Sequence, residues 1–290
     1  MEDTRDAVFE ENRPLLFSIA YRMLGTVADA EDVVQDTYVR WRSDSRDDVK
    51  SPKHYLISAT TRQAINHLNS ARVQREEYVG PWLPEPMLTA TTTDPVELSE
   101  SLMIAFLVLL ESLSPAERAV FLLSEVFDYR PGEVAEIVGK SEANCRQILH
   151  RAREAVNQRR RRYEVSVDAV QPVLETFGRA VEQGDLGALL STLDANAVAY
   201  TDSGGKVRAA INPVSGADRV ARFIAGIAAK GGAGVTYEFT EINRQPGMLA
   251  FRDRELFSTV TFDIADGRIH AIYITSNPDK LQTVREEQQP

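Results

Sequence analysis

A short run near the middle of the chain carries side chains that can read DNA bases. Asparagine, glutamine and arginine make bidentate hydrogen bonds to base edges, and arginine also holds backbone phosphates. Residues of these three types and one histidine lie close together here: Asn144, Arg146, Gln147, His150 and Arg151. Cys145, Leu149 and Ala152 alternate with them at helical spacing. We therefore expect a helix with this apolar stripe facing inward and its polar side chains facing outward.

The residues before this run predict a helix-turn-helix that would present it. Pro131 suits a first helical position, and the apolar face of the first helix follows at Val134, Ala135, Ile137 and Val138. Gly139 supplies a left-handed residue to end that helix, and Ser141 can cap the next one. A helix-turn-helix places its second helix in the DNA major groove. Because the motif is short, an ordinary helical hairpin with a solvated basic face is the alternative.

The charge of the chain is separated into acidic and basic segments. The 290 residues carry a formal net charge of −10, which is unusual for a DNA-binding protein. Residues 50–75 nevertheless contain five Lys or Arg and no acid, and residues 140–162 contain eight against two acids. Residues 2–36 contain nine acids and three arginines. Two basic islands on predicted helices are the expected electrostatic footprint of nucleic-acid binding.

The composition is that of a globular protein long enough for more than one domain. Hydrophobic residues make up 43% and charged residues 26% of the chain. No apolar run is long enough to span a bilayer, and the acidic N-terminus is unlike a signal peptide. The single cysteine, Cys145, excludes an internal disulfide. We therefore expect a cytoplasmic protein with no membrane partner, and the sequence motifs imply no metal and no cofactor.

Three amphipathic segments precede the helix-turn-helix. An apolar helix is expected to begin at Arg13-Pro14 and to end at Gly25. Residues 29–41 predict a second helix whose acids crowd its first turns, where the helix dipole favours them. A third helix is expected from Pro52 to Arg75, and it carries most of the first basic island.

In this order, the segments resemble the regions of bacterial sigma factors. Asp29–Trp41 is similar to the helix that binds core polymerase, and Pro52–Arg75 to the helix that reads the −10 promoter element. Leu113–Arg153 is similar to the helix-turn-helix that reads the −35 element. With no third region between them, the pattern is that of an extracytoplasmic-function (ECF) sigma factor, over roughly residues 1–165.

The resemblance implies roles for individual residues. The residues implied to contact the clamp helices of the largest subunit of core RNA polymerase are Asp29, Glu31, Asp32, Gln35 and Asp36. Those implied to contact the −10 element are Lys50, Lys53, His54, Arg62, Asn66, Asn69 and Arg72, although family members often carry arginine in place of Asn69. The Ser43–Lys50 loop would capture a flipped base, which otherwise costs a few kcal/mol. Ser141 joins Asn144, Arg146, Gln147, His150 and Arg151 at the −35 element.

Residues 77–93 predict a Pro-rich linker, stiff in its first half, between helical modules at 1–76 and 94–163. The linker contains Trp82-Leu83-Pro84-Glu85-Pro86, and its prolines exclude a helix. A polar run, Thr89–Thr93, follows it, and Asp94-Pro95 is expected to open the next helix. In one subgroup of ECF sigma factors this pentapeptide precedes a C-terminal extension.

Residues 167–285 predict such an extension with an α+β fold. Helices are expected at 167–183 and 216–229, and strands at 197–201, 235–242, 248–251, 256–264 and 268–275, with Asp266-Gly267 as a hairpin turn. This pattern resembles the SnoaL-like cone, a fold that encloses a pocket, so the resemblance admits a small molecule in the cone. The fold class is therefore multidomain: two all-α sigma modules followed by an α+β SnoaL-like cone.

Two polar loops of the cone resemble signature segments of the same subgroup. They are Asp202-Ser203-Gly204-Gly205-Lys206 and Asn277-Pro278-Asp279-Lys280-Leu281, and Ser203 stands where the family usually has glycine. The resemblance implies that they face the linker residues Trp82, Leu83, Pro84, Glu85 and Pro86. The cone would then regulate sigma activity in cis. Ordinary turn chemistry would also select Asp, Asn, Gly and Pro here.

The favoured function is a sigma subunit, not an enzyme, that directs core RNA polymerase to promoter DNA. One alternative is a helix-turn-helix regulator that is not a polymerase subunit. The other is a SnoaL-type enzyme with an attached DNA-binding region, in which Asp202 and His270 would form an acid–base pair.

Overall fold

The computed structural model describes residues 2–44, 49–89, 101–157, 167–231 and 234–288. The chain divides into two compact units. The first contains residues 1–77, 93–101 and 106–160, and the second contains residues 78–92, 102–105 and 161–290. In the described part of the chain, no helix is long and apolar enough to cross a membrane.

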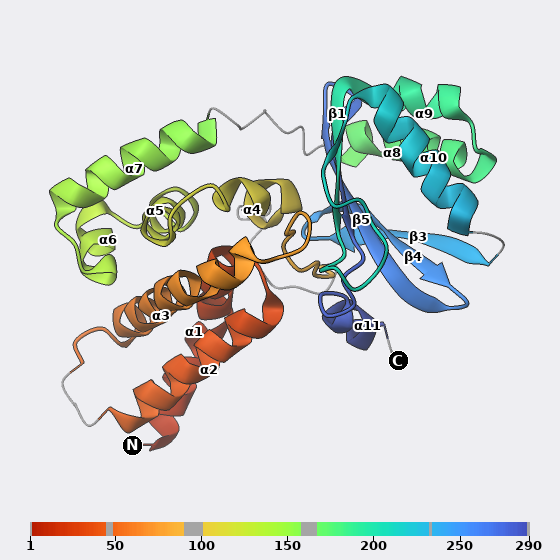
Figure 1. Ribbon diagram of the computed structural model, residues 1–290. Coiled ribbons are helices and arrows are strands. Elements are labelled where there is room, and N and C mark those ends of the chain that lie inside the picture. Colours follow the sequence, from red (N-terminus) through yellow and green to blue (C-terminus); the bar gives the residue numbers. More distant parts are fainter. Residues whose placement is uncertain (1, 45–48, 90–100, 158–166, 232–233, 289–290) are drawn as a thin grey trace. The chain divides into compact units, whose positions relative to one another are not determined.

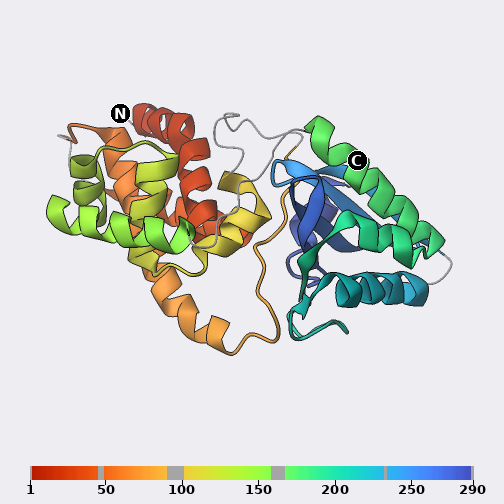
Figure 2. The same cartoon turned by 90° about the horizontal axis from the view of Figure 1, so that it is seen from above.

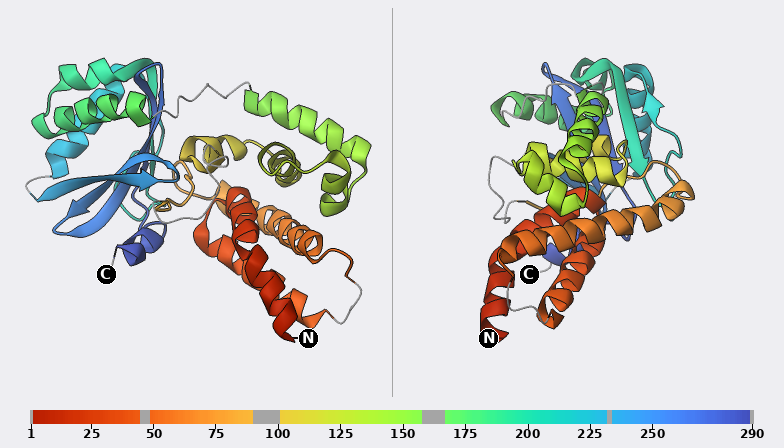
Figure 3. Two further views of the ribbon diagram at one scale, coloured as in Figure 1. Left: turned by 180° about the vertical axis from the view of Figure 1, so that it is seen from behind. Right: turned by 90° about the vertical axis from the view of Figure 1, so that its left-hand side faces the viewer.

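The first unit begins with three helices that lie side by side (Figure 3). They are α1 (Glu2–Leu24), α2 (Val27–Ser43) and α3 (Pro52–Glu76). Their shared core contains Leu16, Ile19, Val33, Trp41 and Leu56, each at most 4% exposed. The amphipathic pattern of these segments therefore correctly predicted three packed helices.

The predicted start of the first helix was wrong. We expected Pro14 to open it, but α1 begins at Glu2 and Pro14 lies inside the helix. The preceding half of α1 is fixed to α2: Arg5 donates to the carbonyl of Trp41 at 3.0 Å, and the Trp41 indole donates to the carbonyl of Arg5 at 2.9 Å. Phe9 is also buried. These tertiary contacts offset the cost of a proline within a helix, which is about 3 kcal/mol.

The first unit continues with further helices, most of them short. They are α4 (Ile104–Leu110, which begins in the second unit), α5 (Pro115–Phe121), a π-helical turn (Leu122–Val126), α6 (Pro131–Val138) and α7 (Glu142–Asn157). Ser114 and Glu117 form a capping box at the start of α5, which satisfies two free backbone N–H groups. This cap fixes the point where α5 begins.

The second unit is an α+β domain. Its helices are α8 (Val167–Gln183), α9 (Leu186–Thr192), α10 (Ala217–Gly231) and α11 (Gln282–Glu287). Its strands are β1 (Leu193–Asp202), β2 (Val214–Ser215), β3 (Val235–Ile242), β4 (Gln245–Arg252), β5 (Glu255–Ala265) and β6 (Arg268–Thr275). The helix over 167–183 and the four strand segments after residue 235 confirm the sequence prediction. Asp266 and Gly267 both have positive φ, 53° and 66°, as a tight hairpin turn requires.

The strands of the second unit pair in the order β2-β1-β6-β5-β4-β3. β3 to β6 form an antiparallel meander, whereas β1 pairs in parallel with β6. α8, α9 and α10 lie together on one side of this sheet (Figures 1 and 2). Their apolar faces meet the sheet in one core that includes Phe177, Leu189, Val220, Phe262 and Ile272. The sheet is therefore covered on that face.

Parts of four predicted segments lie outside the described residues. They are residues 45–48 of the Ser43–Lys50 loop, residues 90–93 of the polar run, the helix start at Asp94-Pro95, and residues 158–162 of the second basic island.

Candidate nucleic-acid interface and linker site

The helix-turn-helix has the predicted caps. α6 ends at Gly139, whose φ is 67°, and the Ser141 hydroxyl accepts a hydrogen bond from the Asn144 N–H at 3.3 Å. The buried stripe of α7 is Cys145, Ile148, Ala152 and Val156. Leu149, which we expected to face inward, is only partly buried, and Ile148 takes its place. Both are apolar neighbours, so the period alone did not distinguish them.

The predicted base-reading side chains are all exposed on α7: Asn144, Arg146, Gln147, His150 and Arg151. Three of these form surface ion pairs, Arg146 with Glu142, His150 with Glu154 at 3.6 Å, and Arg151 with Glu117 at 3.6 Å. Exposed ion pairs contribute about 0–1 kcal/mol, so a DNA phosphate can replace these carboxylates at little cost. The exposed face of α7 is therefore chemically suited to a DNA groove.

The first basic island lies mainly on α3. Lys50, just before the helix, and Lys53, Asn66 and Asn69 on it are exposed, and His54 is half-buried with its Nε2 3.5 Å from a carboxylate oxygen of Glu136. Arg72 belongs to the same helix, and its side chain is not described. These residues offer amide and ammonium groups along one helix.

Arg62 makes a different contact from the one we expected. Its guanidinium donates to the carbonyl of Ile137 at 2.8 Å and to the carbonyl of Glu136 at 2.7 Å. These carbonyls belong to the last turn of α6, where backbone acceptors lack helical partners and the helix dipole favours a cation. Arg62 thus fastens the island on α3 to the first helix of the helix-turn-helix.

The acidic residues of α2 fall into two groups. Asp29 accepts from the Thr26 hydroxyl at 2.5 Å and lies 3.3 Å from His67, and Glu31 pairs with Arg13 at 2.6 Å. Asp32, Gln35 and Asp36 are exposed, and Val39, one turn further on, is 55% exposed. Positions 32, 35, 36 and 39 share one helical face. α2 therefore presents an acidic face with an apolar residue at its end.

The linker is bound to the second unit by a buried ion pair. Asp202 is 0% exposed, and its carboxylate accepts from the Leu83 N–H at 2.8 Å and from the Lys280 ammonium at 2.7 Å. Lys280 also donates to the Leu83 carbonyl and lies 4.0 Å from the centre of the Trp82 ring. Both backbone groups of Leu83 are therefore held by one buried pair.

Tyr78 extends this arrangement at the start of the linker. Its hydroxyl donates to Asp202 and accepts from the Asn277 amide at 2.9 Å. Burial, together with the adjacent Asp202 carboxylate, raises the pKa of Tyr78 well above its usual range. Tyr78 therefore remains a neutral hydrogen-bond donor at physiological pH.

The second half of the linker binds the β3–β4 hairpin and α11. The Met87 N–H donates to the Asn243 side chain at 3.0 Å, and the Asn243 N–H donates to the Met87 carbonyl at 2.8 Å. Glu85 accepts from Thr283 at 2.7 Å. Leu83, Pro84, Glu85 and Pro86 are all buried, and Trp82 is half-buried. We name the linker contacts of residues 78–89 the clasp.

Steric constraints explain why glycine occupies two positions of the first polar loop. Gly204 and Gly205 have φ values of 56° and 72°. A Cβ on Gly204 would lie 2.5 Å from the Asn277 amide nitrogen, and one on Gly205 would lie 3.2 Å from Val79. Lys206 pairs with Asp279 across the two loops, and Pro278 accepts from Arg285 through its carbonyl at 3.4 Å. The loops predicted to face the linker therefore do contact residues 78–83.

Known proteins match the chain over nearly its whole length. Family models for Sigma-70 region 2 and Sigma-70 region 4 match residues 8–73 and 103–156. The ECF RNA polymerase sigma factor SigJ of Mycobacterium tuberculosis is 37% identical over 94% of this chain and 92% of that protein. This chain belongs to the ECF RNA polymerase sigma factors. Its regions 2 and 4 are the modules of promoter recognition and transcription initiation, and sigma factors of this family are not enzymes.

Two further comparisons cover the C-terminal extension as well. The probable ECF RNA polymerase sigma factor SigI of M. tuberculosis is 31% identical over 98% of this chain and 97% of that protein. The crystal structure of M. tuberculosis SigJ superposes with a TM-score of 0.78, at 34% identity, over 95% of this chain and 97% of that one. The sigma factor therefore shares its SnoaL-like extension with SigJ, and the alternative of a regulator that is not a sigma subunit is set aside.

The geometry also contradicts the Asp202–His270 acid–base pair. His270 lies 3.6 Å from Asp194 and 3.2 Å from the carbonyl of Ala265, near the Leu193 end of the β1–β6 ladder. Asp202 pairs with Thr275 at the opposite end. Five strand residues separate the two positions by about 16 Å. Asp202 instead holds the linker of this sigma factor.

Sequence reasoning missed several residues of the clasp. Tyr78, Met87, Thr89, Glu241 and Asn243 all contribute hydrogen bonds to it. The available sequence signal was Asn243, a residue type common in turns, and in the structure Asn243 and Arg244 both have positive φ, 52° and 59°. This turn offers its backbone groups to a neighbouring segment, here the linker. Nothing in the sequence indicated which segment that would be.

Proposed function

We propose that the C-terminal extension restrains this sigma factor in cis by holding the linker between regions 2 and 4. One observation supports this most directly, the buried Asp202–Lys280 pair that bonds both backbone groups of Leu83. A buried charge that loses its partner is strongly destabilising, so the pair and the linker form one unit. Releasing the linker would give the two DNA-binding modules more freedom to reach their promoter elements.

The proposal assigns the two basic faces to the two promoter elements. On α7, Asn144 and Gln147 would read base edges at the −35 element, and Arg146 and Arg151 would hold phosphate or bases. On α3, Asn66 and Asn69 would line the −10 strand. Arg62 would join them only after leaving the α6 carbonyls, because one guanidinium edge cannot serve both partners.

The proposal assigns the exposed face of α2 to core RNA polymerase. Asp32, Gln35 and Asp36 are exposed, and the 55% exposed Val39 adds an apolar contact. Charge-depleted apolar centres with polar rims are typical of protein interfaces. Asp29 and Glu31 would contribute after exchanging His67 and Arg13 for polymerase partners. This assignment includes a cytoplasmic location, where the polymerase acts.

Run-off transcription with core RNA polymerase tests the regulatory role. The test variant is Gly204→Ala, because the new Cβ collides with Asn277 and lies 3.2 Å from the Tyr78 hydroxyl. The control is Gly184→Ala, since Gly184 has a similar φ of 65° and nothing within 4 Å of the added Cβ. Both variants carry similar left-handed backbone strain, so the difference between them reports the clasp.

We expect Gly204→Ala to increase the run-off transcript several-fold over wild type, and Gly184→Ala to leave it unchanged. Binding to core polymerase should be equal for all three proteins. An equal or lower transcript from a folded Gly204→Ala protein would refute the restraint.

A further inference from the structure

One cavity in the C-terminal extension lies beside the clasp. It has a volume of about 610 Å³ and lies between α10, the loop at residues 207–210 and the ends of β4, β5 and β6. Ligand pockets in proteins commonly measure roughly 300–1,000 Å³. The cavity therefore has the size of a site for a small molecule.

The cavity carries an excess of positive charge. Arg208, Lys230 and Arg252 line it, and no Asp or Glu is among its described lining residues. Arg208 and Lys230 are exposed, and no carboxylate within the described chain pairs with either. Elsewhere in the extension, cations such as Lys206 and Arg222 do pair with acids. In a chain with a net charge of −10, this rim favours an anionic ligand.

The walls of the cavity are apolar. Val207 and Ile227 are 44% and 41% exposed, and both face the cavity together with Phe223. Phe257 lines it as well, and the Arg252 guanidinium lies 4.7 Å from the centre of the Phe257 ring. A ligand with an apolar body would cover these surfaces, which favours its binding in proportion to the area removed from water.

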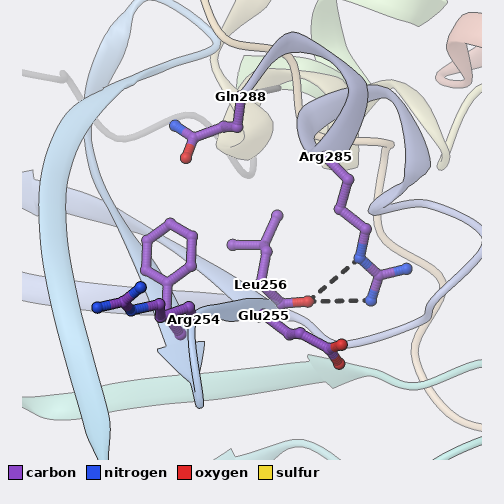
Figure 4. A pocket seen from close by; sticks show the side chains of 6 residues that line it. Arg254, Glu255, Leu256, Arg285 and Gln288 are labelled. Carbon is purple, nitrogen blue, oxygen red and sulfur yellow. Dashed lines mark hydrogen bonds between the residues drawn. The ribbon is translucent and has the colours of Figure 1, made fainter. Parts of the chain in front are cut away.

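Another cavity of the extension lacks this combination. It measures about 460 Å³ and is lined by Arg254, Glu255, Leu256 and Arg285 among others (Figure 4). The Arg285 guanidinium already donates to the Leu256 carbonyl at 3.0 and 3.2 Å, and Glu255 is an acid on the lining. This cavity therefore supplies a matched control for the first.

The charged cavity shares its wall with the clasp. Thr201 lines it and is the neighbour of Asp202, and Ser276 lines it and is the neighbour of Asn277. The Thr201 hydroxyl donates to the Ala210 carbonyl at 2.7 Å, which ties the 207–210 loop to β1. On its other side, this segment lies against the linker, since a Cβ on Gly80 would be 3.6 Å from the Ile211 carbonyl oxygen.

We propose that this cavity binds a small amphipathic anion, a carboxylate on an aliphatic or aromatic body, and that occupancy stabilises the clasp. The carboxylate is held by Arg208 and Lys230, and the apolar body by Phe223, Ile227 and Val207. Binding itself is independent of the regulatory role, whereas its effect on transcription rests on the proposed restraint by the clasp. The ligand orders the loop that packs on Gly80, so it favours the held linker.

Calorimetric titration of the full chain with decanoate, below its micellar concentration, tests the site. Decanol and decyltrimethylammonium serve as probes with the same apolar body and a different head group. The test variant is Arg208→Gln/Lys230→Gln, and Arg254→Gln controls for the loss of a cation at the other cavity. We expect wild type and Arg254→Gln to bind decanoate equally, and the double variant at least tenfold more weakly.

The alternative outcomes are distinct. Absence of decanoate binding, equal affinity for all three probes, or unchanged affinity of a folded double variant would each overturn the site. Coupling between the cavity and the clasp is measured separately. We expect slower amide exchange of residues 78–89 when decanoate is bound. Decanoate binding without slower exchange would refute the coupling while leaving the site. Failure of Gly204→Ala to raise transcription would refute the restraint alone.

Discussion

The Asp202–Lys280 pair allows a quantitative test of the clasp. Asp202→Asn keeps the shape of the side chain and removes its charge. Lys280, only 6% exposed, would then keep the Leu83 carbonyl and the faces of Trp82 and Tyr78, but would lose the Asp202 carboxylate. Breaking a buried pair by removing one partner costs about 3–5 kcal/mol. We therefore expect opening of the clasp to become roughly 150- to 4,000-fold more frequent.

Substitution of the partner, Lys280, should destabilise the clasp less. In Lys280→Met, the Asp202 carboxylate still accepts from Tyr78, from the Leu83 N–H and from the Gly204 N–H at 3.1 Å. Hydrogen bonds from neutral donors partly stabilise a buried carboxylate. The loss of stability in the double variant Asp202→Asn/Lys280→Met should therefore be smaller than the sum of the two single losses, by about 0.5–3 kcal/mol.

Amide exchange at Leu83 is the appropriate measurement, because the Leu83 N–H donates its hydrogen bond to Asp202. It reports local opening without requiring the whole chain to unfold in two states. Asp218→Asn is the control, since it removes an exposed carboxylate from the Arg222 pair in the same unit. A change below tenfold at Leu83 in Asp202→Asn, or strictly additive single effects, would refute the coupled pair.

Three further predictions concern other residues. The pKa of Tyr78 is raised in the folded protein, so the stability that its neutral hydroxyl contributes is full below the unfolded pKa of about 10 and is lost as pH rises through the folded pKa. Amide exchange at Leu83 should therefore accelerate above about pH 10. The acceleration should be smaller in Tyr78→Phe. Ser114→Ala should destabilise the first unit by about 1 kcal/mol in urea unfolding at pH 7. The Ser114 hydrogen bond lowers the pKa of Glu117, so this loss should be largest above the ordinary glutamate pKa of about 4.5 and should shrink as pH falls below it; a loss that stays constant over the whole acid range would contradict the capping box. Burial raises the pKa of the Cys145 thiol, so iodoacetamide should modify it only after unfolding, and rapid modification of the native protein by mass spectrometry would contradict its burial.

The sequence predicted elements whose signals are local. The caps of the helix-turn-helix, Pro131, Gly139 and Ser141, lie within eleven residues of one another, and all three act as expected. The strands of the meander were predicted from alternating runs and form at those segments, and Asp266-Gly267 has the turn conformation that these residue types favour. Such features depend on a few neighbouring residues, so one sequence is sufficient to predict them.

Features that depend on distant partners could not be predicted in this way. The parallel pairing of β1 with β6 joins segments about 75 residues apart, and no local pattern specifies it. The start of α1 depends on Arg5 and Trp41, which exchange hydrogen bonds across 36 residues. The family resemblance, by contrast, indicated that Asp202 and Lys280 face the linker, but the role of Tyr78 and Asn243 required the structure.

Arg62 illustrates why the basic islands alone do not define a DNA-binding surface. Its position in an acid-free segment indicated nucleic-acid contact, yet its guanidinium occupies the last carbonyls of α6. A helix C-terminus is a weak, diffuse acceptor, and a DNA phosphate carries a full charge, so the exchange favours DNA once the strand is within reach. Under the proposed function, the same cation would hold α3 to α6 in the free sigma factor and would contact the promoter after this exchange.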